Sequence, residues 1–150
     1  MNALEKRIAG ILPEIDIAGH TYTIDIKLQE LRNKKEPWKN LKFDQMVTSE
    51  NGENYLFFFR SRRQELFYAS QEMTHVPKDV VMVEIPHELH LDPVGMARKY
   101  GMADDYFQKG YPMQEKRVAN ITPLEKTGLL EHVAQNRRQQ KTQNTKGQKL

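Results

Sequence analysis

The chain contains no cysteine, so it forms no disulfide bond and offers no thiolate ligand to a metal. It also lacks any run of about eighteen apolar residues, which is the length that a membrane-spanning helix requires. The first residues carry no long apolar segment of the kind found in secretory signals. These absences favour a soluble protein, which we expect to be cytoplasmic and to have no membrane partner.

The motifs of common enzyme classes are absent as well. The sequence has no nucleophile elbow, no Walker loop and no dinucleotide-binding glycine fingerprint. Asp104 and Asp105 are adjacent, but the start of a short helix explains them better than acid–base catalysis does. Asp16 and Asp25 fall on the polar face of a predicted hairpin, where solvent explains them. The sequence therefore favours a non-enzymatic protein and predicts no cofactor.

Charge is distributed unevenly along the 150 residues, a length that suits one domain. The composition, 38% hydrophobic and 29% charged, predicts a modest core. The net charge of +3 comes from 23 basic and 20 acidic residues, but the last fourteen residues hold five basic residues and no acid. Residues 1–136 therefore hold 18 basic residues against 20 acidic ones, and the positive charge is concentrated in residues 137–150.

Short apolar or alternating stretches predict the strands of the fold. The predicted strands are residues 14–17, 22–28, 55–59, 66–68 and 80–85. Gly19 between the first two indicates a hairpin, and Asn51-Gly52 is a turn signal before the third. A polar turn at residues 61–64 joins the third and fourth strands into a second predicted hairpin. The last strand is almost continuously apolar, which favours a central place in its sheet. Residues 29–42 are polar, and we predict a loop there with one helical turn at residues 29–33.

Two short helices, and a further short turn over about residues 104–109, are predicted outside these strands. Residues 4–12 place apolar side chains on one helical face, and Pro13 ends the helix. Asp92-Pro93 supplies an N-cap and a first-turn proline, and Gly101 a C-cap, so we expect a helix over about residues 93–100. Strands precede helices without strict alternation, which favours an α+β fold with a mainly antiparallel sheet of about five strands and short flanking helices.

The C-terminal region begins with a capping box, Thr122-Pro123-Leu124-Glu125, which predicts a last helix to about Asn136. After Arg138 the composition is dominated by Gln, Lys, Thr, Asn and Gly. Such a segment cannot bury enough apolar surface to offset the entropy lost on ordering, so we expect a disordered C-terminal tail. The predicted organisation is a single α+β domain over residues 1–136 and a flexible basic tail over residues 137–150.

Potential metal ligands gather at His87, His90 and Asp92. A zinc protease needs two histidines four residues apart on a helix, whereas these are three apart and flanked by prolines, which predicts a loop. His20 and His75 are candidates for a further ligand. The favoured interpretation is surface histidines without a metal, and a metal-dependent enzyme is the less favoured alternative.

Arg60, Arg62 and Arg63 crowd the turn of the second predicted hairpin, beside the aromatic residues of its strands. Basic side chains neutralise phosphates and exposed aromatic rings stack on bases, so this hairpin is a candidate nucleic-acid surface. Alternation places Phe57 and Phe59 on one face, and at least one face must be core. A packed hairpin with an arginine-rich turn is the alternative interpretation.

Arg137, Arg138 and Lys141 lead the basic C-terminal segment. Positive charge without nearby acids attracts a polyanion, and each phosphate contact releases counterions. About five contacts at most give weak, salt-sensitive binding that does not read sequence. The alternative is a solubilising terminus with no partner.

Two stretches carry a resemblance to a known group of proteins. They are Leu12-Pro13-Glu14-Ile15-Asp16-Ile17-Ala18-Gly19-His20 followed by Glu30-Leu31-Arg32, and Leu91-Asp92-Pro93-Val94-Gly95 followed by Lys99-Tyr100-Gly101. They resemble segments of uncharacterised proteins from Bacteroidetes-type bacteria, in patches over the first two-thirds of the chain. Some of those proteins lie on conjugative or other mobile elements, so the resemblance implies a context of DNA mobilisation or its accessory genes.

The leading hypothesis is a non-enzymatic accessory or binding module associated with nucleic acid. Its candidate nucleic-acid-binding residues are Arg60, Arg62, Arg63, Arg137, Arg138 and Lys141. The alternative is a protein–protein interaction module that uses an exposed sheet edge or the aromatic hairpin. A nucleic-acid module loses salt-sensitive binding when its basic tail is removed, whereas an interaction module presents a contiguous apolar patch.

Overall fold

The computed structural model describes the backbone of residues 1–148 and the side chains of residues 1–143. The chain forms two compact units, one of residues 1–57 and 83–121 and one of residues 58–82 and 122 onward. Antiparallel sheets and short helices occupy separate stretches of the chain, which confirms the predicted α+β class. The predicted boundary between a domain and a tail at residue 136 stays a prediction.

The first unit contains a four-stranded antiparallel meander with the order β1-β2-β3-β4. Its strands are β1 (Glu14–Ile17), β2 (His20–Asp25), β3 (Glu30–Asn33) and β4 (Asn40–Lys42). Ile15 lies opposite Tyr22, and Leu31 lies opposite both Ile24 and Leu41. All five side chains are buried, so alternation along these strands builds the core of this unit.

The turn between β1 and β2 confirms the predicted hairpin. Ala18 and Gly19 both have positive φ angles, 52° and 85°, as a two-residue type I′ turn requires. The loop predicted for residues 29–42 is wrong, because β3 and β4 lie within that segment. Each of these strands places one leucine in the core among polar neighbours, and a single apolar residue gives no alternation to detect.

Two short helices of the first unit follow the strand that ends at Pro86. They are α2 (Glu88–Leu91) and α3 (Pro93–Lys99). Asp92 caps α3 by accepting a hydrogen bond from the Gly95 amide at 3.0 Å, as the sequence predicts. The loop predicted around His87 is instead the start of α2, because the His87 ring accepts a hydrogen bond from the Leu89 amide at 3.1 Å.

The N-terminal helix α1 (Ala3–Ile8) is shorter than the predicted helix over residues 4–12 and faces differently. Its predicted apolar face is not the buried one, since Ile8 is 45% and Ile11 is 53% exposed. The one buried residue of α1 is Arg7, which forms an ion pair with Asp92. This ion pair, rather than apolar periodicity, sets the orientation of the helix.

The second sheet has the order β5-β6-β8-β9, with β7 also paired to β6. Its strands are β5 (Val47–Thr48), β6 (Asn54–Arg60), β7 (Glu65–Phe67), β8 (Val80–Pro86) and β9 (Asn120–Pro123). The almost continuously apolar strand β8 lies between β6 and β9, as predicted. Residues 1–148 form nine strands where the sequence predicts about five, because the additional ones are two to four residues long.

The second unit packs its own small core against α4 (Leu129–Gln148). Its buried residues are Val80, Leu124, Leu129 and Val133, with Phe58, Phe67 and Met73 packed against them. The capping box predicted at Thr122 is wrong, because Thr122 belongs to β9 and α4 begins only after Gly128. Gly128 has a φ of 83°, and the Thr127 hydroxyl accepts a hydrogen bond from the Leu129 amide at 3.3 Å.

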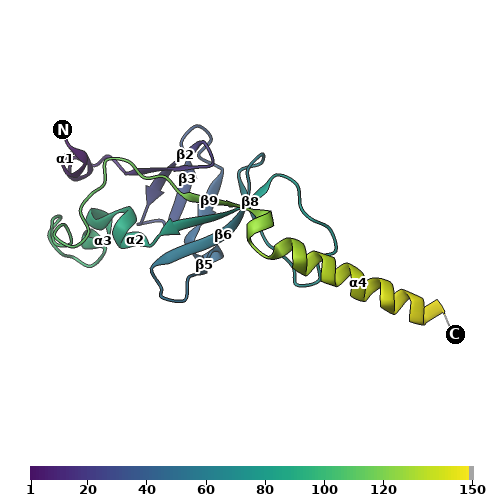
Figure 1. Ribbon diagram of the computed structural model, residues 1–150. Coiled ribbons are helices and arrows are strands. Elements are labelled where there is room, and N and C mark those ends of the chain that lie inside the picture. The colour runs from purple at the N-terminus through teal and green to yellow at the C-terminus, as the bar shows by residue number, and fades with distance from the viewer. Residues whose placement is uncertain (149–150) are drawn as a thin grey trace. The chain divides into compact units, whose positions relative to one another are not determined.

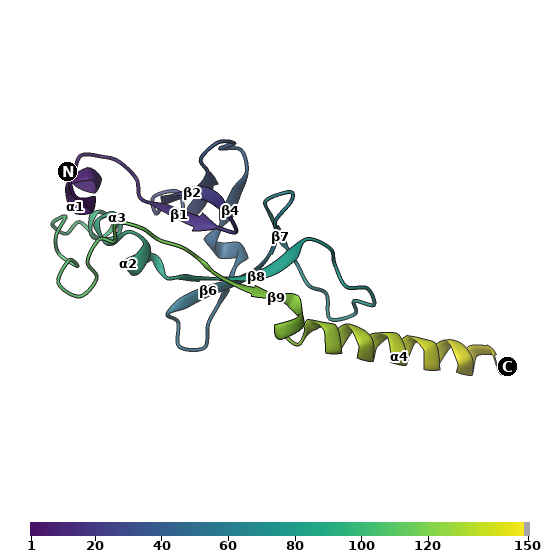
Figure 2. The ribbon, with the colours of Figure 1, turned by 45° about the horizontal axis from the view of Figure 1, so that its top comes forward.

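Helix α4 continues to Gln148, whereas the sequence predicts an end near Asn136 (Figures 1 and 2). Residues 137–148 of the predicted tail are therefore helical, and Lys149 and Leu150 lie outside the described residues. Arginine, glutamine and lysine are good helix formers, so a helix nucleated on packed apolar residues extends into a segment without a core of its own. No helix among residues 1–148 has the length and apolar character to cross a membrane.

Candidate nucleic-acid interface

The first turns of α4 are fixed on one side by the loop that follows β7. Asn136 Nδ2 donates hydrogen bonds to the Gln71 and Met73 carbonyls, both at 2.8 Å. His132 Nε2 lies 2.7 Å from the Gln71 carbonyl oxygen, which it can bond as the Nε2–H tautomer. Arg137 Nε donates to the Thr74 carbonyl. These contacts hold the loop on the same side of the helix as Leu129 and Val133.

The opposite side of α4 is exposed and carries positive charge. Arg138 follows Leu129 by nine residues, which is two and a half helical turns, so its side chain leaves from the side opposite that buried leucine. Lys141 is also exposed, but it follows Arg137 by four residues, so its side chain leaves the helix between those of Arg137 and Arg138. Helix α4 has no acidic residue after Glu131. A cationic helix side without acids is suited to a polyanion.

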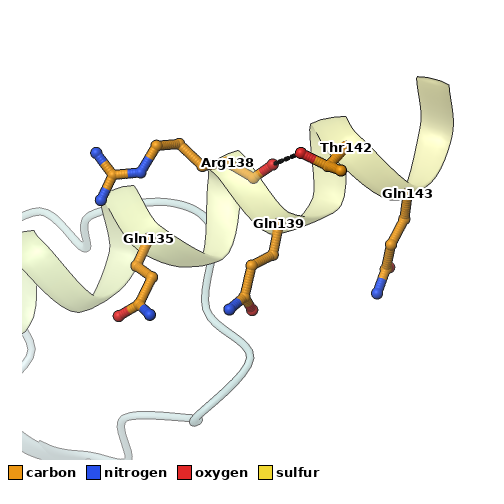
Figure 3. A pocket seen from close by; sticks show the side chains of 5 residues that line it. All are labelled: Gln135, Arg138, Gln139, Thr142 and Gln143. Atoms are coloured by element: carbon orange, nitrogen blue, oxygen red, sulfur yellow. Dashed lines mark hydrogen bonds between the residues drawn. The ribbon is translucent and has the colours of Figure 1, made fainter. Parts of the chain in front are cut away.

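A shallow hollow of about 490 Å³ runs along one flank of the same helix. It is lined by Gln135, Arg138, Gln139, Thr142 and Gln143. In Figure 3 the three glutamines project from one side of α4, whereas the Arg138 side chain runs back towards the start of the helix. The Thr142 hydroxyl donates to the Arg138 carbonyl at 2.9 Å. The flank thus offers a row of amide groups beside a guanidinium.

The hairpin of β6 and β7 carries three arginines. Arg60, at the end of β6, has a structural role, whereas Arg62 and Arg63 in the turn are exposed. The Arg60 guanidinium lies 5.1 Å from the centroid of the Phe67 ring, a cation–π arrangement. The side chains of Arg62 and Arg63 are 82% and 75% exposed, at 3.6 and 3.9 Å from their nearest carboxylates. Such long surface ion pairs are weak, so both guanidinium groups can exchange these partners for phosphates.

The aromatic residues of β6 do not form a stacking surface for bases. Phe57 is 6% exposed and Phe59 is fully buried. Phe58 packs against the core of the second unit. The rings of Phe57 and Phe59 are therefore not available for stacking, and the arginines of this hairpin offer phosphate contact. Tyr68, which follows β7, is 64% exposed.

The histidine cluster is an aromatic contact in the first unit. The His87 and His90 rings lie 4.9 Å apart, and the Tyr111 ring packs edge-on against both. Burial lowers the pKa of His87, and the charge of His90 lowers it further. Asp92 instead binds Arg7 and the Gly95 amide. Within the described residues no three His, Asp or Glu side chains gather as metal ligands would.

Two ion pairs of the first unit, Arg7–Asp92 and Arg32–Asp25, could not be predicted from the sequence. Arg7 Nε donates to both carboxylate oxygens of Asp92, at 3.0 and 3.1 Å, across 85 residues of chain. The solvated position predicted for Asp25 is wrong, because Asp25 is buried and accepts a hydrogen bond from Arg32 at 2.7 Å. Burial acts to raise the pKa of Asp25, but its hydrogen bonds from the Leu28 amide and Arg32 outweigh burial and lower it.

Comparison of the chain with protein-family models, with curated proteins and with solved structures finds no match. The geometry of the two units therefore carries the functional argument.

Proposed function

We propose that this protein is a non-enzymatic binding module that associates with nucleic acid through its second unit. The observation that supports it is the asymmetry of α4. Asn136 and Arg137 fix the first turns of the helix, whereas Arg138 and Lys141 are exposed along a helix that has no acid after Glu131. A helix that is polar along most of its length gains little from packing on its own chain, and phosphates supply the missing interactions.

The six predicted arginines and lysines divide into two roles under this proposal. Arg62, Arg63, Arg138 and Lys141 contact phosphates. Arg60 and Arg137 are positioning residues, because one covers Phe67 and the other binds the Thr74 carbonyl. Four phosphate contacts give weak binding with a steep salt dependence, since each contact releases about one counterion. Such binding suits an accessory protein that acts beside other components on nucleic acid, in the cytoplasm and in the mobile-element context that the resemblance implies.

The test is binding of labelled duplex DNA, single-stranded DNA and RNA of one sequence, at about 50 mM and about 150 mM salt. The R138Q/K141Q double variant is compared with Q135A/Q143A, which changes the same helix without changing its charge. We expect R138Q/K141Q to weaken binding to every probe and to lower the salt slope by about two, while Q135A/Q143A binds as the parent does.

Two outcomes contradict the proposal. Equal affinities of the parent chain and R138Q/K141Q place the phosphate contacts elsewhere. Absence of binding to all three probes at low salt removes nucleic acid as the partner. A protein partner that binds the β6–β7 hairpin then becomes the leading hypothesis. The burial of Phe57 and Phe59 reduces the apolar surface that is available to such a partner.

A further inference from the structure

The first unit contains a cavity of about 360 Å³ beside α1, apart from the surfaces discussed above. Its wall includes apolar side chains of Leu12, Pro13 and Met113 together with the cations Lys6 and Arg117. The volume lies in the range of small-molecule sites, which combine an apolar lining with a few polar groups.

Arg117 is the unusual member of this wall. It is 9% exposed, and its Nε atom has no hydrogen-bond partner among the described residues. Within the described part of the chain, the hydrogen-bond acceptor of its Nη2 atom is Met113 Sδ, a weak acceptor at 3.9 Å. Burial lowers the pKa of Arg117, while the charges of Asp92 and Glu115 act in the opposite direction. An arginine remains charged in a protein, so this buried guanidinium requires an anion.

The carboxylates around the cavity are engaged by other groups. Asp92 accepts hydrogen bonds from Arg7 Nε and from the Gly95 amide. The Glu14 carboxylate lies 2.8 Å from Lys34 Nζ. Glu115 Oε1 accepts from the Ala3 amide at 2.9 Å. None of these contacts gives Arg117 a hydrogen-bonded acid, so the positive charge at the cavity is incompletely balanced by its own chain.

The backbone on both sides of Arg117 is held in place. The Arg117 carbonyl accepts a hydrogen bond from the Asp16 amide at 2.9 Å, and the Ala119 amide donates to the Asp16 carbonyl at 2.8 Å. Val118 forms a parallel bridge with Asp16 at the edge of β1. The guanidinium is therefore carried by a fixed segment, as a preorganised binding group is.

We propose that this cavity binds a small molecule that carries one oxyanion group, a phosphate or a carboxylate, on an apolar body. Arg117 binds the oxyanion, Lys6 adds a second positive charge, and Leu12, Pro13 and Met113 contact the apolar part. A charge-assisted bond to the oxyanion satisfies the buried guanidinium, which its own chain does not. The proposal is independent of nucleic-acid association, which concerns the other unit.

The test is titration calorimetry of the full chain with phenyl phosphate and with benzoate, and with benzyl alcohol as the uncharged analogue. We expect one equivalent of one or both anions to bind and benzyl alcohol not to bind. The R117M variant should weaken binding at least about tenfold, and R117K should restore part of it because it returns the charge without the fork of donors. The stronger of the two anions identifies the oxyanion class.

Matched variants separate this cavity from other cations. K27Q removes a lysine that lines a different cavity of the same unit, of about 760 Å³, and R138Q/K141Q removes charge from α4. Both should bind the anions as the parent does. If R117M does not fold, K6Q is the alternative test variant, because Lys6 is exposed and its loss should also weaken anion binding. Failure of both anions to bind the parent, or unchanged binding in R117M and K6Q, overturns the proposal.

Discussion

The two units use arginine in opposite ways. In the first unit Arg7 is buried and donates to both oxygens of Asp92, and Arg117 is buried beside a cavity. In the second unit Arg62 and Arg138 are exposed, and the nearest carboxylate to Arg62 is 3.6 Å away. A count of charges treats these residues alike. Burial and the distance to the nearest carboxylate distinguish arginines that stabilise the fold from arginines that are free to bind another molecule.

The largest expected effect is on the buried pair of the first unit. Asp92→Ala leaves the Arg7 charge buried without its partner and removes the cap of α3, which should lower the free energy of unfolding by about 3–5 kcal/mol. Urea denaturation at about pH 7 measures it. Asp104→Ala is the control, because Asp104 pairs with Arg98 at the surface and should cost less than about 1 kcal/mol. Equal losses in both variants would contradict the distinction.

A second substitution tests the same pair without changing its charge. A Cβ atom on Gly95 would lie 2.2 Å from Asp92 Oδ2, so Gly95→Ala must displace the carboxylate from Arg7. We expect a loss of about 1–3 kcal/mol in urea denaturation, as in other overpacked cores. Gly110→Ala serves as the control, since open space surrounds Gly110 and its stability should change by less than about 0.5 kcal/mol.

The same contrast explains which parts of the fold the sequence could predict. Strands β1, β2, β6 and β8 carry repeated apolar residues, and α3 carries an Asp-Pro start and a terminal glycine, so local patterns identify all of them. Strands β3 and β4 bury one leucine each, which is too little for a periodic signal. The orientation of α1 depends on Arg7 and Asp92, which are 85 residues apart, and no local pattern reports such a pair.

The candidate sites are subject to the same limit, because local sequence patterns do not report contacts between distant residues. The count of charges identifies the basic residues of α4 and of the β6–β7 turn, because a local concentration of charge is a property of composition. It could not show that Arg137 binds the Thr74 carbonyl or that Arg60 covers Phe67, because both contacts depend on how loops and strands pack. Arg117 was missed for the same reason, since its environment comes from α1, β1 and the segment before β9.

Acidification should show the contribution of a second, half-buried ion pair in the first unit, between Asp25 and Arg32. The folded-state pKa of Asp25 is lower than its ordinary value of 3.8, so the carboxylate stabilises the fold above about pH 4 and loses this contribution as the pH falls further. Asp25→Asn should cost about 1–2 kcal/mol at pH 7. The gap in unfolding free energy between Asp25→Asn and the parent should narrow between about pH 4 and pH 2. A constant gap would assign the loss to packing rather than to charge.

The second unit offers a smaller structural effect at the anchor of α4. Asn136 donates to the carbonyls of Gln71 and Met73, so Asn136→Ala should cost about 1 kcal/mol and free the loop. Hydrogen exchange should increase in residues 70–75 and in the first turns of α4, while β1 and β2 of the other unit exchange as before. Gln139→Ala is the control, because this exposed glutamine of the same helix faces the open flank. Unchanged exchange in the loop would show that the Asn136 hydrogen bonds do not hold it on the helix.

The smallest expected effect on stability belongs to the exposed arginines of the β6–β7 turn. Arg62→Gln with Arg63→Gln should change the free energy of unfolding by less than about 0.5 kcal/mol, because both side chains are exposed and their ion pairs are long. The salt slope of nucleic-acid binding should nevertheless fall by about two. Arg60→Gln is the matched control, since it removes a cation–π contact worth about 0.5–1 kcal/mol and should alter stability more than binding. If the double variant destabilises the fold as much as Arg60→Gln does, exposure is a poor guide to function in this unit, and the contrast between the arginines of the two units fails.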